Sequence, residues 1–265
     1  MSKANNIDSH YYSGQGVVML AQYDDQNKLT GYIPVGNVSA LTIGIETARN
    51  EHRESQTGAR GVDRVVTTEV GATVSMTVEN FIQENLALGL YGSSASVAAA
   101  AGQAMKFNVM QGRVYALDHI AVENVVVDDG QDPVVITYEE DKNYTVNTDA
   151  GSIRIMTAEE QAEAGAANVI ADNTDIGVTY DFGDHKVLQG LETSSAPVRA
   201  LRFEGLNTVE NDATVVVEVF RFETAPLAEY ALINEEIANI ELSGSALADA
   251  TITEGSRYFR QLSAK

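Results

Sequence analysis

The chain has 265 residues, of which 44% are hydrophobic, and its 38 acidic and 17 basic side chains give a formal net charge of −21. The hydrophobic content excludes a disordered chain. The acidic balance argues against a protein that grips nucleic acid, because phosphate binding needs clustered Lys and Arg. Cysteine is absent, which excludes disulfides and thiolate metal sites.

The first 16 residues are polar and predict an arm. They include Tyr11 and Tyr12 and lack the apolar core of a signal peptide. No apolar run in the chain approaches the roughly 20 residues that a membrane helix needs. We therefore expect synthesis in a cytoplasm, no membrane insertion by this chain, and an arm over residues 1–16 that lies on another surface.

A short buried strand is predicted over residues 17–23, and a long hairpin follows it. The first strand of the hairpin covers residues 38–47, and the second, residues 65–79, alternates between apolar and polar side chains. Its predicted inward residues are Val70, Ala72, Val74, Met76 and Val78. Residues 48–64 predict a charged loop between the strands. A charged hairpin of this length suits assembly rather than catalysis.

One helix is predicted over residues 80–91. Glu79 or Asn80 can cap its start, and Gly92 can end it. The helical spacing places Ile82, Leu86 and Leu90 on one apolar face. We expect this face to pack against the apolar side of the hairpin's second strand.

The remainder of the chain predicts short strands. Residues 93–104 are small and uncharged and are interpreted as a surface loop. Residues 105–182 alternate between short strands and turns, with a surface turn of helix predicted over residues 158–167. A second long hairpin is predicted over residues 198–222, and a last segment over residues 232–242. The expected fold class is therefore mainly β: a single β-sandwich or barrel domain over residues 17–265 with one flanking α-helix.

The chemical candidates are weak. The four histidines (His10, His52, His119 and His185) lie in different segments without the spacing of metal ligands, and the aspartate groups fit turns. No nucleophile or phosphate-loop motif occurs. We predict no enzyme and no catalytic, cofactor or metal residues.

The charged loop over residues 48–64 has two interpretations. Long hairpin tips are usually only solvated. This tip, however, carries four of the basic residues of a very acidic chain, and such residues would find acidic surface on another copy. A self-assembly contact is the favoured interpretation.

Several segments together resemble the major tail tube proteins of long-tailed, siphovirus-like bacteriophages. The segments are the arm with GQGV at residues 14–17, LTIGIET at 41–47, EHRESQTGARG at 51–61, ENFIQENLALGLYG at 79–92, RFEGLN at 202–207 and IELSGSALAD at 240–249. Their order and spacing carry the resemblance, which touches most of the chain.

The resemblance implies hexameric rings stacked into a hollow tube, with long hairpins that form a shared inner β-barrel. The hairpins would be residues 40–79 and 198–222. Residues that would line the lumen are Glu46, Glu69, Thr73, Ser75, Thr77, Arg202, Glu204 and Glu218. Residues that would contact the next ring are Arg49, Glu51, Arg53, Glu54, Arg60, Asp63 and Arg64. The phase of the second hairpin stays open, because both of its faces are apolar around residues 215–220.

The expected function is a structural subunit of a virion tail whose acidic lumen conducts DNA during ejection. The implied partners are copies of the chain itself, a tape measure protein, a tail terminator and the genomic DNA, which passes without specific binding. Two alternatives remain. One is a sandwich-type binding module, such as a capsid decoration protein or an adhesin. The other is the tube protein of a contractile tail or a secretion machine.

Overall fold

The computed structural model describes residues 11–56 and 58–263 and confirms a mainly β protein. Seventeen strands and two helices occur in the described residues, and the strand pairs of the three larger sheets are antiparallel. The chain divides into two compact units. Unit 1 comprises Met1–Ser94 and Leu188–Lys265, and unit 2 comprises Ala95–Val187. This division differs from the single domain expected from the sequence.

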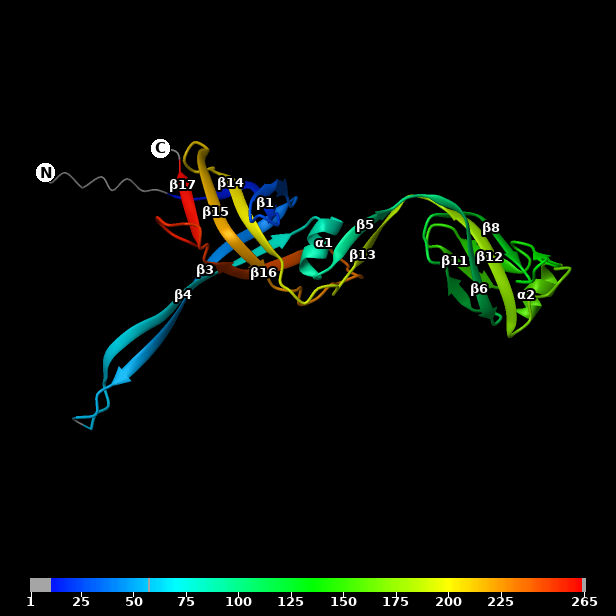
Figure 1. The fold of residues 1–265 in the computed structure, drawn as a ribbon, viewed down its shortest axis with the longest axis horizontal. Helices are drawn as coiled ribbons and strands as arrows, with labels where there is room; N and C mark the ends of the chain where they lie inside the picture. The colour runs from blue at the N-terminus through cyan, green and yellow to red at the C-terminus, as the bar shows by residue number, and fades with distance from the viewer. Residues whose placement is uncertain (1–10, 57, 264–265) are drawn as a thin grey trace. The chain divides into compact units, whose positions relative to one another are not determined.

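Unit 1 contains one open eight-stranded sheet. Its order is β2-β1-β14-β15-β16-β4-β3, and β17 pairs with β15 beside that path. The strands are β1 (Gly14–Tyr23), β2 (Leu29–Pro34), β3 (Val38–Arg53), β4 (Val62–Val78), β14 (Val198–Asn207), β15 (Ala213–Thr224), β16 (Ile240–Leu247) and β17 (Phe259–Ser263). The long strand β15 is shared at one edge: β17 pairs with its first half and β16 with its second (Figure 1).

The core of unit 1 lies on one face of this sheet. In β4, Ala72, Val74, Met76 and Val78 are buried, as the alternation predicted, and they cluster with Leu201, Val219, Phe222 and Leu242. Val70 lies on the same side of β4 as Ala72 but is 56% exposed, so its predicted packing in the core is wrong. The pairing of β16 with β4 ends at Ala72, and Val70 lies beyond it, where β4 pairs only with β3 in the described residues.

Helix α1 (Gln83–Gly89) closes the core and is shorter than predicted. Leu86 and Leu88 are buried in the core cluster, and Leu90 packs against it. Ile82 is 38% exposed, because it is the extended N-cap residue rather than a helical one, and no side chain caps the helix. The left-handed residue after the helix is Tyr91 (φ 52°), not Gly92. Gly92 is needed for a different reason: a Cβ there would lie 1.7 Å from the carbonyl oxygen of Gln189.

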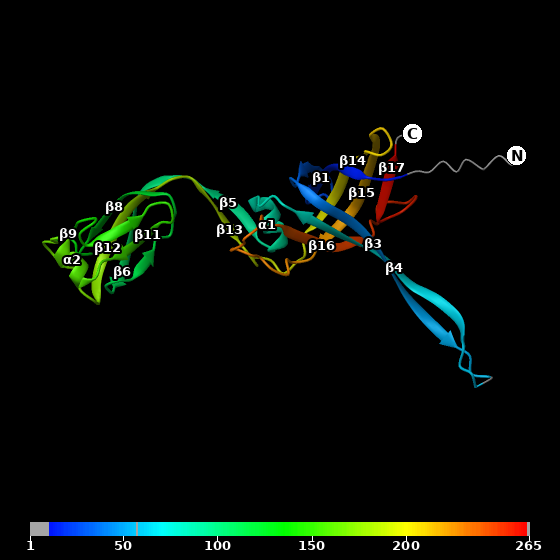
Figure 2. The same cartoon turned by 180° about the vertical axis from the view of Figure 1, so that it is seen from behind.

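Unit 2 has its own core between two small sheets (Figure 2). One sheet has the order β6-β12-β8-β9 and the other β10-β11-β7. The strands are β6 (Ala100–Val109), β7 (Val114–Ala116), β8 (Val122–Asp128), β9 (Thr137–Tyr138), β10 (Tyr144–Asn147), β11 (Ser152–Ile155) and β12 (Thr174–Phe182). Ile153 and Ile155 from one sheet and Ile176 and Tyr180 from the other are almost fully buried.

Residues 93–104 are strand rather than the surface loop expected from their composition. They contribute β5 (Ser93–Val97), which pairs with β13 (His185–Gln189), and the start of β6. Both crossings of the chain between the units occur in this pair of strands. Small side chains are compatible with such pairing, because the backbone hydrogen bonds hold the strands and little side-chain volume is needed.

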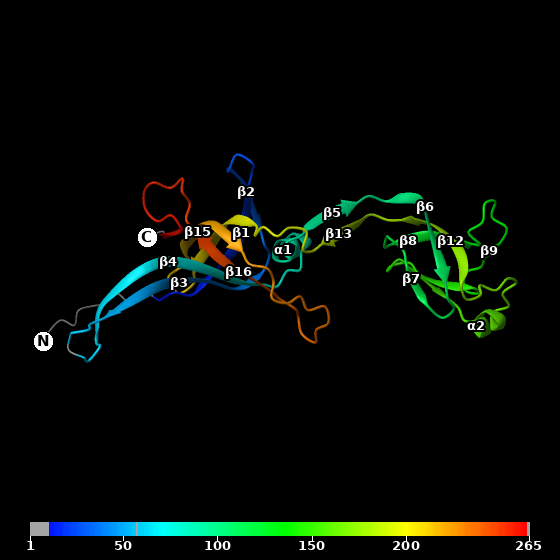
Figure 3. The same cartoon turned by 60° about the horizontal axis from the view of Figure 1, so that its bottom comes forward.

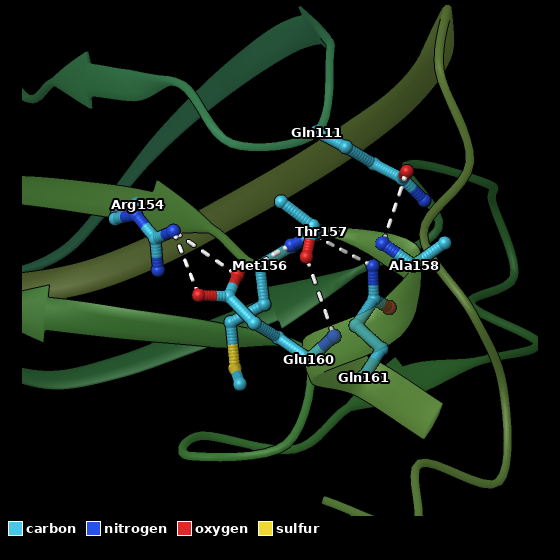
Figure 4. A network of polar contacts seen from close by, with 7 residues as sticks. All are labelled: Gln111, Arg154, Met156, Thr157, Ala158, Glu160 and Gln161. Carbon is cyan, nitrogen blue, oxygen red and sulfur yellow. Dashed lines mark hydrogen bonds and ion pairs between the residues drawn. The ribbon is translucent and has the colours of Figure 1, made fainter. Parts of the chain in front are cut away.

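Helix α2 (Ala158–Glu163) is held by a capping box (Figure 4). The Glu160 backbone N–H donates to the Thr157 hydroxyl over 3.3 Å, and the Thr157 N–H donates to the Glu160 carboxylate over 2.7 Å. Arg154 donates from Nη2 to both oxygens of that carboxylate at 3.0 Å. The Thr157 backbone bond and then Arg154 lower the pKa of Glu160 below its ordinary value, because both stabilise the charged form.

Candidate assembly surfaces

The face of the unit 1 sheet opposite the core is polar along β3, β4 and β16. Residues paired directly across antiparallel strands share a face. Ser75 pairs with Thr42 on one side and Ser243 on the other, and its hydroxyl donates to Glu241 over 3.3 Å. By the same register, Glu46, Glu69, Thr73 and Thr77 share this face with Ser245. We call this surface the polar face.

The polar face continues across β14, β15 and β17 through an ionic cluster. Glu218 pairs directly with Arg202 on β14 and with Arg260 on β17. Its carboxylate accepts hydrogen bonds from Arg202 Nη1 and, at 2.5 Å, from Arg260 Nε. Arg202 Nε donates to Glu204 over 2.6 Å. The bond to Glu204, aided by the charge of Glu218, raises the pKa of the Arg202 guanidinium.

The phase of the second hairpin, left open by the sequence, follows from a bulge in β15. Val219 pairs with Leu201, whereas Phe222 pairs with Arg199, so β15 spans one residue more than β14 between these pairs. Val215, Val219 and Phe222 therefore all face the core. Both faces looked apolar in the sequence because Val216, which pairs with Glu204, lies on the same side as Glu218, while Val215 and Val219 face the core.

All eight predicted lumen residues thus lie on one face of one sheet, with four glutamates and one arginine among them. Sequence reasoning missed Arg260, Glu241, Ser243 and Ser245, which extend that face. The alternation of residues 240–247 was the available signal for the last three. Arg260 had no local signal, because its position depends on the pairing of β17 with β15.

Both ends of the unit 1 sheet are open. Within the described residues, β3 pairs only with β4 and β2 only with β1. Strand β3 has 16 residues and thus presents a long row of free backbone groups along its outer side. Such edges pair readily with another chain unless they are covered.

The distal half of the β3–β4 hairpin projects from the sheet as a two-stranded ribbon (Figures 1 and 3). The expected loop over residues 48–64 is wrong in its bounds, because β3 continues to Arg53 and β4 begins at Val62. Val65, Val66 and Val70 on this ribbon are about half exposed. A two-stranded ribbon is marginally stable alone in water, so these valines are suited to burial against a further surface.

The predicted inter-ring residues are gathered around the tip of this ribbon. Arg49, Glu51 and Arg53 belong to β3, Asp63 and Arg64 to β4, and Glu54 and Arg60 to the connection. Arg53 Nη2 lies 3.4 Å from Glu51, and His52 Nδ1 lies 2.6 Å from Asp63. These side chains are largely exposed, so their pairing contributes little to folding and leaves them accessible to a partner.

The predicted arm is described only from Tyr11, so residues 1–10 lie outside the described residues. Tyr11 and Tyr12 are 67% and 61% exposed. The carbonyl of Tyr11 accepts from Asn207 Nδ2 over 2.8 Å, and the Ser13 N–H donates to Asn207 Oδ1 over 3.0 Å. Strand β1 starts at Gly14, so the last part of the expected arm is sheet.

Two of the histidines are neighbours in unit 2, which the sequence did not predict. His119 stacks on Phe182 with ring centroids 3.7 Å apart, and the His185 ring is 5.6 Å from that of His119. In the part of the chain that the structure describes, no three His, Cys, Asp or Glu side chains are grouped as metal ligands. Across the same residues, none of the helices is sufficiently long and apolar for a membrane span.

Comparison with known proteins identifies a family. A family model described as protein of unknown function UCP028589 matches residues 11–262. This match covers nearly the whole chain, both units included. No curated protein matches the chain.

Proposed function

The chain belongs to the family described as protein of unknown function UCP028589, and we propose that it is the structural subunit of a phage tail tube. Copies of the chain form hexameric rings, and the rings stack into a tube within the virion tail. The polar face lines the lumen. The genomic DNA crosses it during ejection, and the tape measure protein and the tail terminator are the other partners.

The polar face is the observation that carries this proposal. One face of the sheet packs on the core and is closed by α1. The opposite face is polar because it meets water or a polar cargo. Carboxylates and hydroxyls there repel DNA phosphates evenly, so the DNA slides without being trapped. The arginines of the face are held by Glu204 and Glu218, which lowers their attraction for phosphate.

The open edges and the projecting hairpin support the assembly part of the proposal. Closing six sheets edge to edge into one inner β-barrel satisfies the free backbone groups of β3 and β2. The ribbon formed by β3 and β4 then reaches the neighbouring ring through the charged side chains at its tip. Both contacts use surfaces that the monomer leaves exposed.

Negative-stain electron microscopy of the purified protein tests the proposal. We expect rings, or hollow tubes whose length grows with protein concentration. Monomers or trimers under all concentrations and salt conditions would refute it. Tubes surrounded by a co-expressed sheath would favour the contractile-tail or secretion-machine alternative over a long non-contractile tail.

A binding module remains a second candidate, and the separate core of unit 2 is the observation that favours it. An inserted unit with its own core can fold and act independently of the sheet that carries it. Replacing residues 98–184 by a short Gly-Ser linker separates the two functions. Tubes that form without unit 2 would assign assembly to unit 1 and leave unit 2 free for binding. Loss of all assembly would make unit 2 part of the tube contacts.

A further inference from the structure

Unit 1 contains an apolar pocket between β1, β2 and α1. Its volume is about 520 Å³, within the range of roughly 300–1,000 Å³ that is typical of binding pockets. Leu20, Ile33, Val35, Ile82 and Leu88 line it. Ile33 is 68% exposed and Ile82 is 38% exposed, so the apolar lining is open to solvent in the monomer.

A partly buried arginine lies in the wall of this pocket. The Arg199 guanidinium donates to the carbonyl oxygen of its neighbour Val198 over 3.0 Å. Burial lowers the pKa of Arg199, because desolvation disfavours its charged form. Glu84 lines the pocket as well. The pocket therefore combines an apolar lining with a cation that a carboxylate would stabilise.

The same unit exposes a segment with the complementary chemistry. Residues 225–239 connect β15 to β16 without regular structure, a length that in compact domains is usually functional. Leu232, Ile233 and Ile237 are 76%, 96% and 87% exposed. Glu235 and Glu236 lie between these side chains and are also exposed. We call residues 225–239 the acidic loop.

We propose that the acidic loop of one copy docks into the pocket between β1, β2 and α1 of a second copy. Leu232, Ile233 or Ile237 fills the apolar lining, and Glu235 or Glu236 pairs with Arg199. This inference rests on the proposed self-assembly and assigns to it a lateral contact between neighbours in a ring.

The geometry of unit 1 favours a contact between copies over closure within one chain. The acidic loop and β2 lie on opposite sides of α1 (Figure 3), and β2 contributes Ile33 and Pro34 to the pocket lining. Two different surfaces on one protomer make a head-to-tail contact, and such contacts generate rings when the rotation closes. Burying the exposed aliphatic side chains supplies the driving force.

Disulfide capture tests the contact directly, because the chain has no cysteine of its own. A chain carrying Ile33→Cys is mixed with a chain carrying Ile233→Cys under mild oxidation, and non-reducing electrophoresis measures the covalent dimer. The control mixture pairs Ile33→Cys with Val135→Cys, a residue of unit 2 that is 76% exposed. Docking raises the local thiol concentration, so we expect at least about a tenfold excess of the first dimer over the control. Equal yields, or a predominance of either homodimer, would overturn the proposal.

A charge exchange tests the role of Arg199. Arg199→Glu and the double change Glu235→Lys with Glu236→Lys should each reduce the dimer yield, and the three changes combined should restore it. Failure of the combination to restore the yield would overturn the pairing. Leu232→Ser with Ile237→Ser, made in the chain that carries Ile233→Cys, provides a second variant. Leu232 and Ile237 are 76% and 87% exposed, so their replacement leaves the monomer folded, and an unchanged dimer yield would refute the apolar docking.

The outcomes also separate this inference from the proposed function. Hollow tubes of the unaltered chain without preferential cross-linking would overturn the acidic-loop contact alone. Preferential cross-linking without rings or tubes would support the contact and overturn the tail-tube proposal.

Discussion

Glu218 should be the most important charged side chain for the stability of unit 1. It is 8% exposed and lies at the centre of three adjacent strands, where its carboxylate accepts from Arg202 on β14 and from Arg260 on β17. Replacing it with alanine removes both acceptors at once. The matched control is Glu204→Ala, which removes an exposed carboxylate from the same cluster.

The expected magnitude follows from the exposure of each partner. A hydrogen bond to a charged group contributes about 1.5–3 kcal/mol when it is shielded from water. The Arg202 side chain is 26% exposed and keeps Glu204, while Arg260 is 58% exposed and is largely screened. We therefore expect Glu218→Ala to lower the free energy of unfolding of unit 1 by about 2–3 kcal/mol. Glu204→Ala should lower it by about 0–1 kcal/mol, the range of exposed ion pairs.

Hydrogen exchange read by mass spectrometry can locate the effect. In the described residues, strand β17 pairs only with β15, and Arg260 is its ionic contact. Peptides covering residues 259–263 should lose protection in Glu218→Ala before the core of unit 2 changes. Equal protection in the two variants would refute the reasoning, since it would mean that the cluster does not anchor β17.

Three further predictions concern the hairpin, the polar face and unit 2. Deleting residues 51–61 should leave a folded subunit that forms no tubes in electron micrographs; tubes of normal length would exclude a role of the tip between rings. Changing Glu46 and Glu69 to lysine should permit tubes but slow DNA ejection in phage carrying the variant, because the lumen would then attract phosphate; unchanged ejection kinetics would show that these residues do not face the DNA. Because the pKa of Glu160 is lowered by folding, its charged form stabilises unit 2 at pH values above the ordinary pKa of 4.5. This contribution is lost as the pH falls through the lowered pKa. The thermal midpoint of Glu160→Gln should therefore approach that of the unaltered chain on acidification, and a difference independent of pH would contradict this.

The candidate surfaces show which parts of the assembly hypothesis depend on local sequence. The sequence predicted which side chains of β4 share a face. Successive side chains of a strand point to opposite faces, and this does not depend on the neighbouring strands. The same argument placed Glu46 and Glu69 with the hydroxyl residues of β4, and their register with β3 agrees. The sequence predicted the position of helix α1 but not its first residue. Ile82 fits the helical spacing of apolar residues, but its backbone is extended.

What the sequence alone determined is therefore the mainly β class, the two long hairpins and the polar side of β4, all of which depend on periodicity over a few neighbouring residues. The tertiary structure decided the rest. Strand β1 pairs with β14, whose residues lie far along the chain, and the bulge in β15 sets the phase of Glu218. The division into two units arises because the apolar residues of 105–182 pack among themselves and not with those of the large sheet. Contacts between distant segments leave no local period, so only the folded chain brings Glu218, Arg202 and Arg260 together.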